Sequence, residues 1–418
     1  MLASGPVNSF SRILTLTICL VSAVAFGADE PVASDPVFNA LKTDGTTVSG
    51  RVREFSAGGV TLATLDKEVR AIPPGQLIKL SREGYSVSQV PEAPALIFPG
   101  GDRLHRTTFG AATDTSLQAV SFILGSLPLA VPLESLLGVV MAVPTDTAAE
   151  AVEALILRIR EEPRKSEVLW LGNGDRISGG FLGLSEKAVE FQQGKAPVKI
   201  DRSGIVAIGF DPGLVSYPMP GEGFLELTFT DGSRLGMTGL KIDQGQIVGK
   251  SRFGATIRVQ LSEVVRMHAR TASIVYLSDR IPAAQRSIPY VGPPRAARID
   301  VSVEGQTLRL SGQDYDRGIG TQSRSLLAYR LEPGDKRFQA LVGVDDRAGP
   351  LGNVVFRVLV DNNEVRFASP PMAARDAPRA IDLDVSGAKI LILATEYGER
   401  GAVRDVADWV EARIIRDP

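Results

Sequence analysis

The chain contains 418 residues, which is too long for one ordinary domain and predicts roughly two to four. Its 46 basic and 48 acidic residues leave a formal net charge of −2. No basic excess exists to attract a phosphate backbone, and this argues against nucleic acid as a partner. Hydrophobic residues make up 44% of the chain, which is enough for a core, and 42 glycines with 26 prolines predict many turns between short strands.

Residues 1–27 have the pattern of a secretory signal peptide. Arg12 supplies the positive charge, Ile13 to Phe26 is an uncharged apolar run, and small residues place the cleavage site before Ala28. The alternative is a retained N-terminal anchor. Cys19 is the single cysteine and lies in this segment, so the mature chain has neither a disulfide nor a thiol nucleophile. We expect a secreted or periplasmic bacterial protein of the cell envelope.

The first half of the chain contains four related β segments, at residues 37–84, 94–143, 166–211 and 222–269. Each opens with a strand and a turn that pairs Asp with Gly, which favours a tight hairpin. Each closes with one pattern: an apolar residue, four others, two apolar residues, any residue and another apolar residue. The four copies of this pattern are Ile72, Leu77, Ile78 and Leu80; Val131, Leu136, Leu137 and Val139; Ile200, Ile205, Val206 and Ile208; Val259, Val264, Val265 and Met267.

Each repeat therefore has the length and rhythm of four or five short strands. This predicts tandem small barrels of SH3-like or Sm-like architecture, since barrel closure removes exposed strand edges. The sequence leaves open whether each copy closes alone or two copies share a barrel. The apolar segment from Val120 to Met141 is interrupted by two prolines and Glu134, so we interpret it as a pair of strands and not as a membrane span.

One helix is predicted at residues 147–162, between the second and third repeats. Thr147 and Glu150 form a capping box, and Pro163 follows the predicted end. The apolar residues that recur at helical spacing are Val152, Leu155, Ile156 and Ile159. A narrow apolar stripe with mixed charges favours a helix packed on the barrels over a partner-binding or membrane-surface helix.

Residues 273–416 are predicted to form a jelly-roll β-sandwich. Short alternating segments such as Phe338 to Val344 and Phe356 to Val360 are separated by turn residues, as strands of a sandwich are. The proline-rich segment from Arg280 to Arg298 is either a linker or an early loop of this domain.

Seven stretches of this domain carry a family resemblance. In order they are Tyr276–Asp279, Tyr315–Gly320, Ser323–Leu331, Phe338–Asp346, Gly352–Val358, Asp382–Lys389 and Asp405–Trp409. Together they resemble the NPCBM family of carbohydrate-binding modules, which is related to the family-51 modules attached to glycoside hydrolases. The resemblance implies a jelly-roll sandwich that binds sugars or glycosylated surfaces. Gln322 and Val406 stand where the family often has histidine, and the loss of a donor or acceptor there adds weight to a structural role.

Sugar recognition needs an aromatic face together with groups that hydrogen-bond hydroxyls. Trp409 is the candidate for the face, unless it belongs to the core. The candidate polar groups are Gln322, Arg324, Asp345, Asp346, Asp405 and Asp408. The alternative for Asp346 is a turn residue.

No cofactor is predicted, and a structural Ca²⁺ at Asp345, Asp346 and Glu396 is a weaker hypothesis, since their spacing fits no calcium loop. We expect no catalysis, because the chain lacks a nucleophile elbow, a P-loop and a dinucleotide fingerprint in context. The two histidines, His105 and His268, belong to different repeats and are expected on the barrel surfaces. The sequence thus predicts an exported, non-catalytic glycan-binding protein whose repeats act as spacer or assembly platform; the alternative is a structural or interaction protein of the envelope. A protein partner in the envelope is expected in either case.

Overall fold

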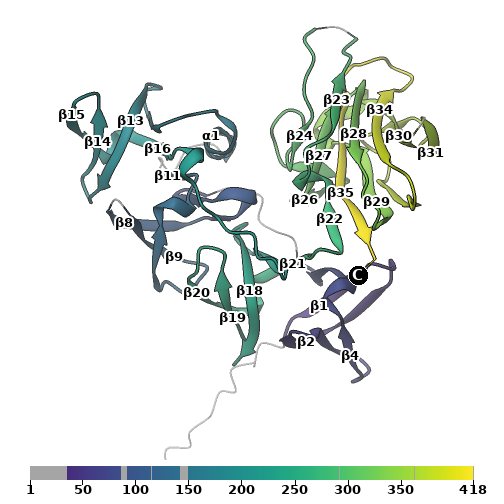
Figure 1. Ribbon diagram of the computed structural model, residues 1–418, viewed down its shortest axis with the longest axis horizontal. Coiled ribbons are helices and arrows are strands. Elements are labelled where there is room, and N and C mark those ends of the chain that lie inside the picture. The colour runs from purple at the N-terminus through teal and green to yellow at the C-terminus, as the bar shows by residue number, and fades with distance from the viewer. Residues whose placement is uncertain are drawn as a thin grey trace, which may run out of the picture. The chain divides into compact units, whose positions relative to one another are not determined.

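The computed structural model is almost entirely β-structure (Figure 1), as the sequence predicts. It describes residues 35–85, 92–113, 115–141, 149–290, 292–361 and 363–417. The predicted signal peptide and Thr147 of the capping box lie outside these residues. Within the described ranges, no helix is long and apolar enough to cross a membrane.

In each repeat of the first half, the first strand pairs antiparallel with the last. The first repeat contains β1 (Val37–Lys42), β2 (Thr47–Ser56), β3 (Gly59–Thr64), β4 (Val69–Ile72) and β5 (Leu77–Arg82). The second contains β6 (Ala95–Ile97), β7 (Arg103–Leu104), β8 (Thr107–Ala112), β9 (Ser116–Ser121), β10 (Pro128–Pro132) and β11 (Gly138–Val140). The third contains β12 (Glu167–Leu171), β13 (Arg176–Leu184), β14 (Ala188–Gln193), β15 (Ala196–Asp201) and β16 (Ile205–Gly209). The fourth contains β17 (Phe224–Phe229), β18 (Arg234–Asp243), β19 (Gln246–Ser251), β20 (Thr256–Gln260) and β21 (Val264–Arg270).

The shared closing pattern marks the same local structure in all four repeats. A strand ends, one 3₁₀ turn follows, and the last strand of the repeat begins, as at Ile72, Pro74–Gln76 and Leu77 of the first repeat. Most apolar residues of the pattern that follow this turn are buried, Ile78 and Leu80 completely, whereas Leu137 and Val206 are partly exposed. The pattern therefore marks a tight reversal that brings the last strand beside the first.

The prediction of closed barrels is wrong. In the described part of the chain, no ladder joins the last strand of a repeat to the strand before it. The last strands instead pair between repeats: β5 with β21, where Leu80 lies opposite Met267, and β11 with β16, where Val139 lies opposite Ile208. An edge strand needs a partner for its backbone groups, and here a second repeat supplies it. Two repeats thereby form one continuous sheet.

The predicted helix is confirmed as α1 (Ala149–Glu161). Val152, Ile156 and Ile159 are buried in a small core that also contains Val140 and Trp170. The helix thus packs on strands of the second and third repeats. The segment Val120 to Met141 contains two strands, β10 and β11, as expected.

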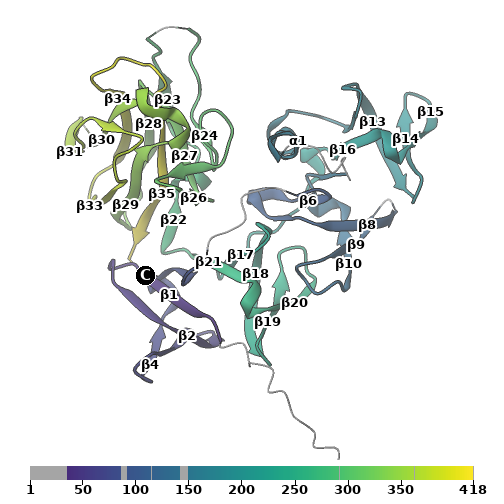
Figure 2. The same ribbon diagram turned by 180° about the vertical axis from the view of Figure 1, so that it is seen from behind.

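Residues 274–416 form the predicted β-sandwich (Figure 2). One sheet contains β22 (Ile274–Tyr276), β24 (Arg298–Ile299), β27 (Gly318–Gln322), β29 (Asp335–Val344), β33 (Arg379–Asp384) and β35 (Val406–Arg416). The other contains β23 (Ala284–Ser287), β28 (Ser325–Arg330), β30 (Asn353–Val360), β31 (Glu364–Ala368), β32 (Met372–Ala373) and β34 (Ile390–Tyr397). A hairpin is added by β25 (Leu308–Leu310) and β26 (Gln313–Tyr315). The proline-rich segment is part of this sandwich, because β23 pairs with β28.

The two histidines are not on the surface, contrary to expectation. His105 is 2% exposed and His268 is 1% exposed. His105 Nδ1 lies 3.1 Å from the Glu92 carbonyl oxygen, and His268 lies beside Glu411 of β35. Both imidazoles are buried where repeats meet other parts of the chain, which periodicity within one repeat does not reveal.

The packing of α1 gives a stability prediction. Ile159→Ala removes a fully buried side chain whose Cγ2 faces Gly138, so we expect a loss of about 2–4 kcal/mol. Arg158→Ala, at a half-exposed position on the same helix, should change stability by less than about 0.5 kcal/mol. Urea unfolding followed by fluorescence measures both. Equal effects would contradict the packing of the helix.

Candidate functional site

A buried hydrogen-bond network joins the two sheets at one end of the sandwich. The indole Nε1 of Trp409 donates to Thr395 Oγ1 at 3.0 Å, and Thr395 Oγ1 lies 2.9 Å from Thr321 Oγ1. Trp409 is completely buried and packs edge-to-face on Phe356, with ring centroids 5.2 Å apart. The side chain predicted as a sugar platform therefore presents no face to solvent. It fixes Thr321 and Thr395 instead.

A second buried contact fixes the neighbouring loop. Asp405 accepts hydrogen bonds from Ser323 Oγ and, at 2.9 Å, from the backbone N–H of Asn353. The amide oxygen of Asn353 in turn accepts the N–H of Glu399 at 2.7 Å. Asp405 is 1% exposed and does not reach solvent. Its two hydrogen bonds fix the segments around Ser323 and Asn353.

Three side chains beside this network do reach solvent. Gln322 ends β27 and is partly exposed. Arg324 follows Ser323, is 44% exposed, and pairs through Nε with Glu396 Oε2 at 2.8 Å. Glu396 follows Thr395 in β34. Two of the predicted polar groups, Gln322 and Arg324, thus lie next to residues that the buried network holds in place.

Two tyrosines that the sequence analysis did not single out lie at the same end. Tyr290 is 73% exposed and stands edge-on to Tyr397, with ring centroids 6.0 Å apart. Tyr397 donates its hydroxyl hydrogen bond to the Ile288 carbonyl at 2.6 Å, and Ile288 exchanges backbone hydrogen bonds with Arg324. An exposed aromatic side chain and a charged pair therefore share one loop cluster. No pattern in the sequence distinguishes this tyrosine from any other.

The two departures from the family pattern also meet here. Gln322 of β27 lies directly opposite Val406 of β35 in the antiparallel register. Paired residues of neighbouring strands project to the same face. Both positions where the family often has histidine are therefore neighbours, beside Arg324.

The other predicted acids have structural partners. Asp345 caps a 3₁₀ turn by accepting the N–H of Arg347 at 2.8 Å, and it also accepts the N–H of Arg309. Asp346 accepts the backbone N–H groups of Ser311 and Gly312 at 2.9 and 2.7 Å. In the described ranges, no three His, Cys, Asp or Glu side chains gather as a metal site requires, so nothing here supports the calcium hypothesis.

Asp408 forms a buried acid pair with Asp345. Both are completely buried, and within the described residues no donor reaches either carboxylate oxygen of Asp408. Burial, followed by the charge of Asp345, raises the pKa of Asp408 well above its ordinary value. Burial also raises the pKa of Asp405, against the effect of its hydrogen bonds. A proton on Asp408 removes the repulsion and allows donation to Asp345.

This pair predicts a pH dependence of stability. The unfolded chain ionises Asp408 near pH 3.8, whereas the folded chain keeps the proton to higher pH. Its contribution is therefore complete below pH 3.8 and is lost as pH rises through the folded pKa. Asp408→Asn, which keeps a neutral donor there, should lose less stability than wild type between pH 4 and 8.

Thermal unfolding across that pH range measures the difference, with Asp384→Asn as the control. Asp384 is exposed and its pKa is lowered, first by the backbone N–H of Ser386, so the control should retain the loss of stability at high pH. Parallel pH profiles for wild type and Asp408→Asn would show that the carboxyl is not protonated in the folded state.

Comparison with known proteins identifies the domain that carries this loop cluster. Residues 274–415 match the family model described as NPCBM/NEW2 domain. Alpha-1,3-galactosidase B of Akkermansia muciniphila is 30% identical over 118 residues, which cover 27% of this chain and 15% of that protein. A curated protein of Renibacterium salmoninarum is also 30% identical, over 112 residues covering 27% of this chain and 7% of that protein. The chain thus spans less than a sixth of either relative.

A solved structure is similar to part of the chain. CBM51 from Clostridium perfringens GH95, in complex with methyl-galactose, is 27% identical, covers 34% of this chain and 99% of that chain, and superposes with a TM-score of 0.31. The sequence motifs and the family match cover the same strands, from β22 to β35. Residues 274–415 of this chain are an NPCBM/NEW2 domain.

Proposed function

We propose that the chain is an exported, non-catalytic glycan-binding protein, and that its NPCBM/NEW2 domain binds carbohydrate at the loop cluster around Arg324. The observation that carries the proposal is the exposed ring of Tyr290 at the same end of the sandwich as the Arg324–Glu396 pair. An exposed aromatic ring covers the apolar face of a sugar, and a charged pair with an amide donates to and accepts from its hydroxyls.

Galactose-containing glycans are the first ligand class to test. The similar region in Akkermansia muciniphila belongs to a protein named for action on an α-1,3-linked galactose. Gln322 supplies both a donor and an acceptor in the slot where the family often has histidine, so it replaces part of the hydrogen-bonding capacity of an imidazole. In this proposal the four repeats act as a spacer or assembly platform, and the predicted signal peptide directs export.

The non-catalytic part of the proposal rests on how the titratable groups are engaged. Both histidines are buried, and the carboxylates of Asp345, Asp346 and Asp405 accept hydrogen bonds from the protein itself. Groups engaged in this way hold the fold together and do not face a substrate.

A structural role in the envelope is the second candidate, and one observation favours it. Trp409, Asp405 and Asp408, which the sequence offers as ligand groups, are all buried. If the domain serves only to pack against the repeats, its exposed loop cluster has no ligand.

A glycan array separates the two candidates. We expect the chain from Ala28 to Pro418 to bind selectively, and Tyr290→Ala to weaken binding about fivefold to tenfold, as loss of one aromatic contact does. Arg324→Ala should weaken it by a similar factor. Tyr85→Ala is the matched control, because Tyr85 is an exposed tyrosine outside the domain.

Trp409→Ala serves as a folding control and not as a probe of the site. Removal of the buried indole should cost about 3–5 kcal/mol of stability. Absence of binding to every glycan by a protein that unfolds cooperatively would reject the glycan-binding proposal and support the structural candidate.

A further inference from the structure

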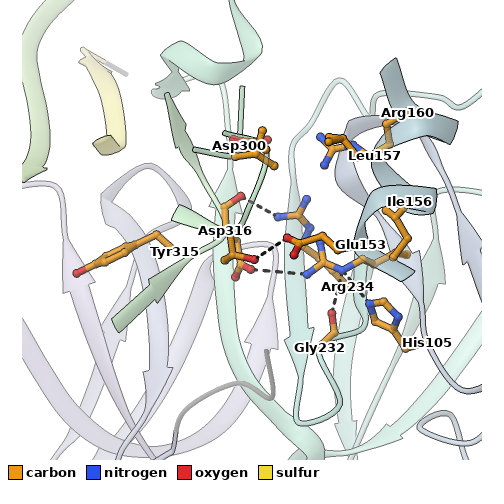
Figure 3. A pocket seen from close by; sticks show the side chains of 14 residues that line it. His105, Glu153, Ile156, Leu157, Arg160, Gly232, Arg234, Asp300, Tyr315 and Asp316 are labelled. Carbon is orange, nitrogen blue, oxygen red and sulfur yellow. Dashed lines mark hydrogen bonds and ion pairs between the residues drawn. The ribbon is translucent and has the colours of Figure 1, made fainter. Parts of the chain in front are cut away.

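A cavity of about 80 Å³ lies where α1, the second and fourth repeats and the NPCBM/NEW2 domain come together (Figure 3). Helix α1 contributes Leu157 and Arg160, the repeats contribute Arg103 and Arg234, and the domain contributes Asp300 among others. The space exceeds what a single water occupies. It is therefore large enough for a small polyatomic ligand.

The carboxylates that line this cavity already have partners. Asp300 accepts the N–H of Gly318 at 3.1 Å and pairs with Arg317 at 3.3 Å. Asp316 pairs with Arg266 at 3.0 Å. Glu153 accepts the hydroxyl of Thr307 at 3.2 Å. Asp300 and Asp316 are thus paired with the cations Arg317 and Arg266, whereas Glu153 has a neutral partner.

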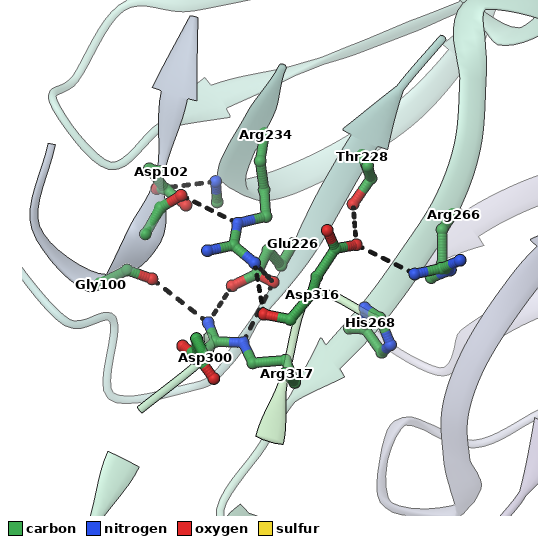
Figure 4. Close-up of polar contacts among 12 residues, drawn as sticks. Gly100, Asp102, Glu226, Thr228, Arg234, Arg266, His268, Asp300, Asp316 and Arg317 are labelled. Carbon is green, nitrogen blue, oxygen red and sulfur yellow. Dashed lines mark hydrogen bonds and ion pairs between the residues drawn. The ribbon is translucent and has the colours of Figure 1, made fainter. Parts of the chain in front are cut away.

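Arg234 is engaged in the same network. Figure 4 shows Arg234 and Arg317 converging on Glu226. Burial alone would raise the pKa of Glu226, but Arg317 and Arg234 outweigh it and hold this pKa well below its usual value. Arg234 also donates to the Gly101 carbonyl at 2.9 Å. Its charge is thus compensated without a ligand.

Arg160 is different, because within the described ranges it forms neither a hydrogen bond nor an ion pair. It lines the cavity, and Figure 3 places it on the helix side, across from Asp300. Burial lowers the pKa of Arg160, Asp300 offsets part of this effect, and Arg234 adds to it. Arg160 is partly exposed, and a guanidinium that lines a cavity with its donors uncommitted can donate to the oxygens of an anion there.

Arg103 faces the same space and is held in position by His105. The Nε of Arg103 donates to His105 Nε2 and to the Gly232 carbonyl, both at 3.1 Å. His105 Nδ1 donates to the Glu92 carbonyl, which fixes the neutral tautomer with Nε2 as acceptor. One terminal nitrogen of Arg103 forms a long ion pair with Asp316 at 3.9 Å, and the other is left for a ligand. Burial, then Arg234, lowers the pKa of Arg103 to about 10.

We propose that this cavity is a binding site for a small oxoanion, held between the guanidinium groups of Arg160 and Arg103. Two planar forks of N–H donors match the oxygens of a phosphate, a sulfate or a carboxylate. Bound there, the anion touches the helix, the repeats and the NPCBM/NEW2 domain. It is separate from the loop cluster proposed to bind carbohydrate.

Calorimetric titration of the chain from Ala28 to Pro418 tests the proposal. The ligands are sodium phosphate, sodium sulfate and sodium glucuronate, each at an ionic strength matched with sodium chloride. We expect saturable binding by wild type and an affinity at least about tenfold weaker in Arg160→Gln. Arg158→Gln, two residues away on the exposed face of α1, should bind as wild type does. Tighter binding of glucuronate than of phosphate and sulfate assigns a sugar acid, and the reverse order assigns a free inorganic anion.

Thermal unfolding without added anion shows whether Arg160→Gln changes the stability of the fold, and so separates that effect from a loss of anion binding. Because Arg160 has no partner among the residues that the structure describes, Arg160→Gln should unfold at the same temperature as wild type or higher, and only wild type should gain stability as phosphate is added. Either of two results would overturn the proposal: no saturable binding of any of the three anions, or equal affinity in wild type and Arg160→Gln. A lower unfolding temperature for anion-free Arg160→Gln would overturn it as well, since Arg160 would then be a structural residue.

Discussion

The hydrogen bond from the Trp409 indole to Thr395 joins the core of the sandwich to its exposed end. Thr395 also meets Thr321 of the opposite sheet, so one buried contact fixes the spacing of β34 and β27. Glu396 follows Thr395, and Gln322 follows Thr321, which places both solvent-exposed polar groups on a rigid base. A binding surface built on the ends of paired strands needs little ordering when a ligand arrives. Asp405 likewise fixes the loop that carries Arg324, because it accepts a hydrogen bond from Ser323 Oγ.

The junction between the repeats and the NPCBM/NEW2 domain depends on buried charge. Arg317 belongs to the Tyr315–Gly320 stretch of the domain, yet its principal partner, Glu226, belongs to the fourth repeat. Lys79 and Glu411 pair across the same junction at 2.5 Å. Buried ion pairs contribute little net stability, but loss of one partner leaves an uncompensated charge. These pairs lie where the two surfaces meet, and Arg160 differs from the neighbouring cations because it has no partner among the described residues.

Much of the fold follows from local sequence, and the rest depends on contacts between distant segments. The closing pattern marked the end of each repeat, where the structure has a 3₁₀ turn followed by the last strand. It did not predict that β5 pairs with β21, because ladder partners in another repeat leave no local signal. Likewise, the motif around Trp409 identified the domain. Whether the indole is buried or exposed depends on its contacts with Phe356 and Thr395, which lie far away in the sequence. Tyr290 was missed because an isolated tyrosine in a proline-rich loop has no pattern.

The proposed carbohydrate site predicts which residues of the NPCBM/NEW2 domain a bound sugar contacts. Two-dimensional NMR of the isotope-labelled chain, titrated with a galactoside that binds, measures this residue by residue. We predict that the largest shift changes fall on Gln322, Arg324, Glu396 and Tyr290, while the Trp409 indole N–H, shielded in the core, shifts little. Shift changes centred on another surface, with Tyr290 and Arg324 unaffected, would contradict the proposed site.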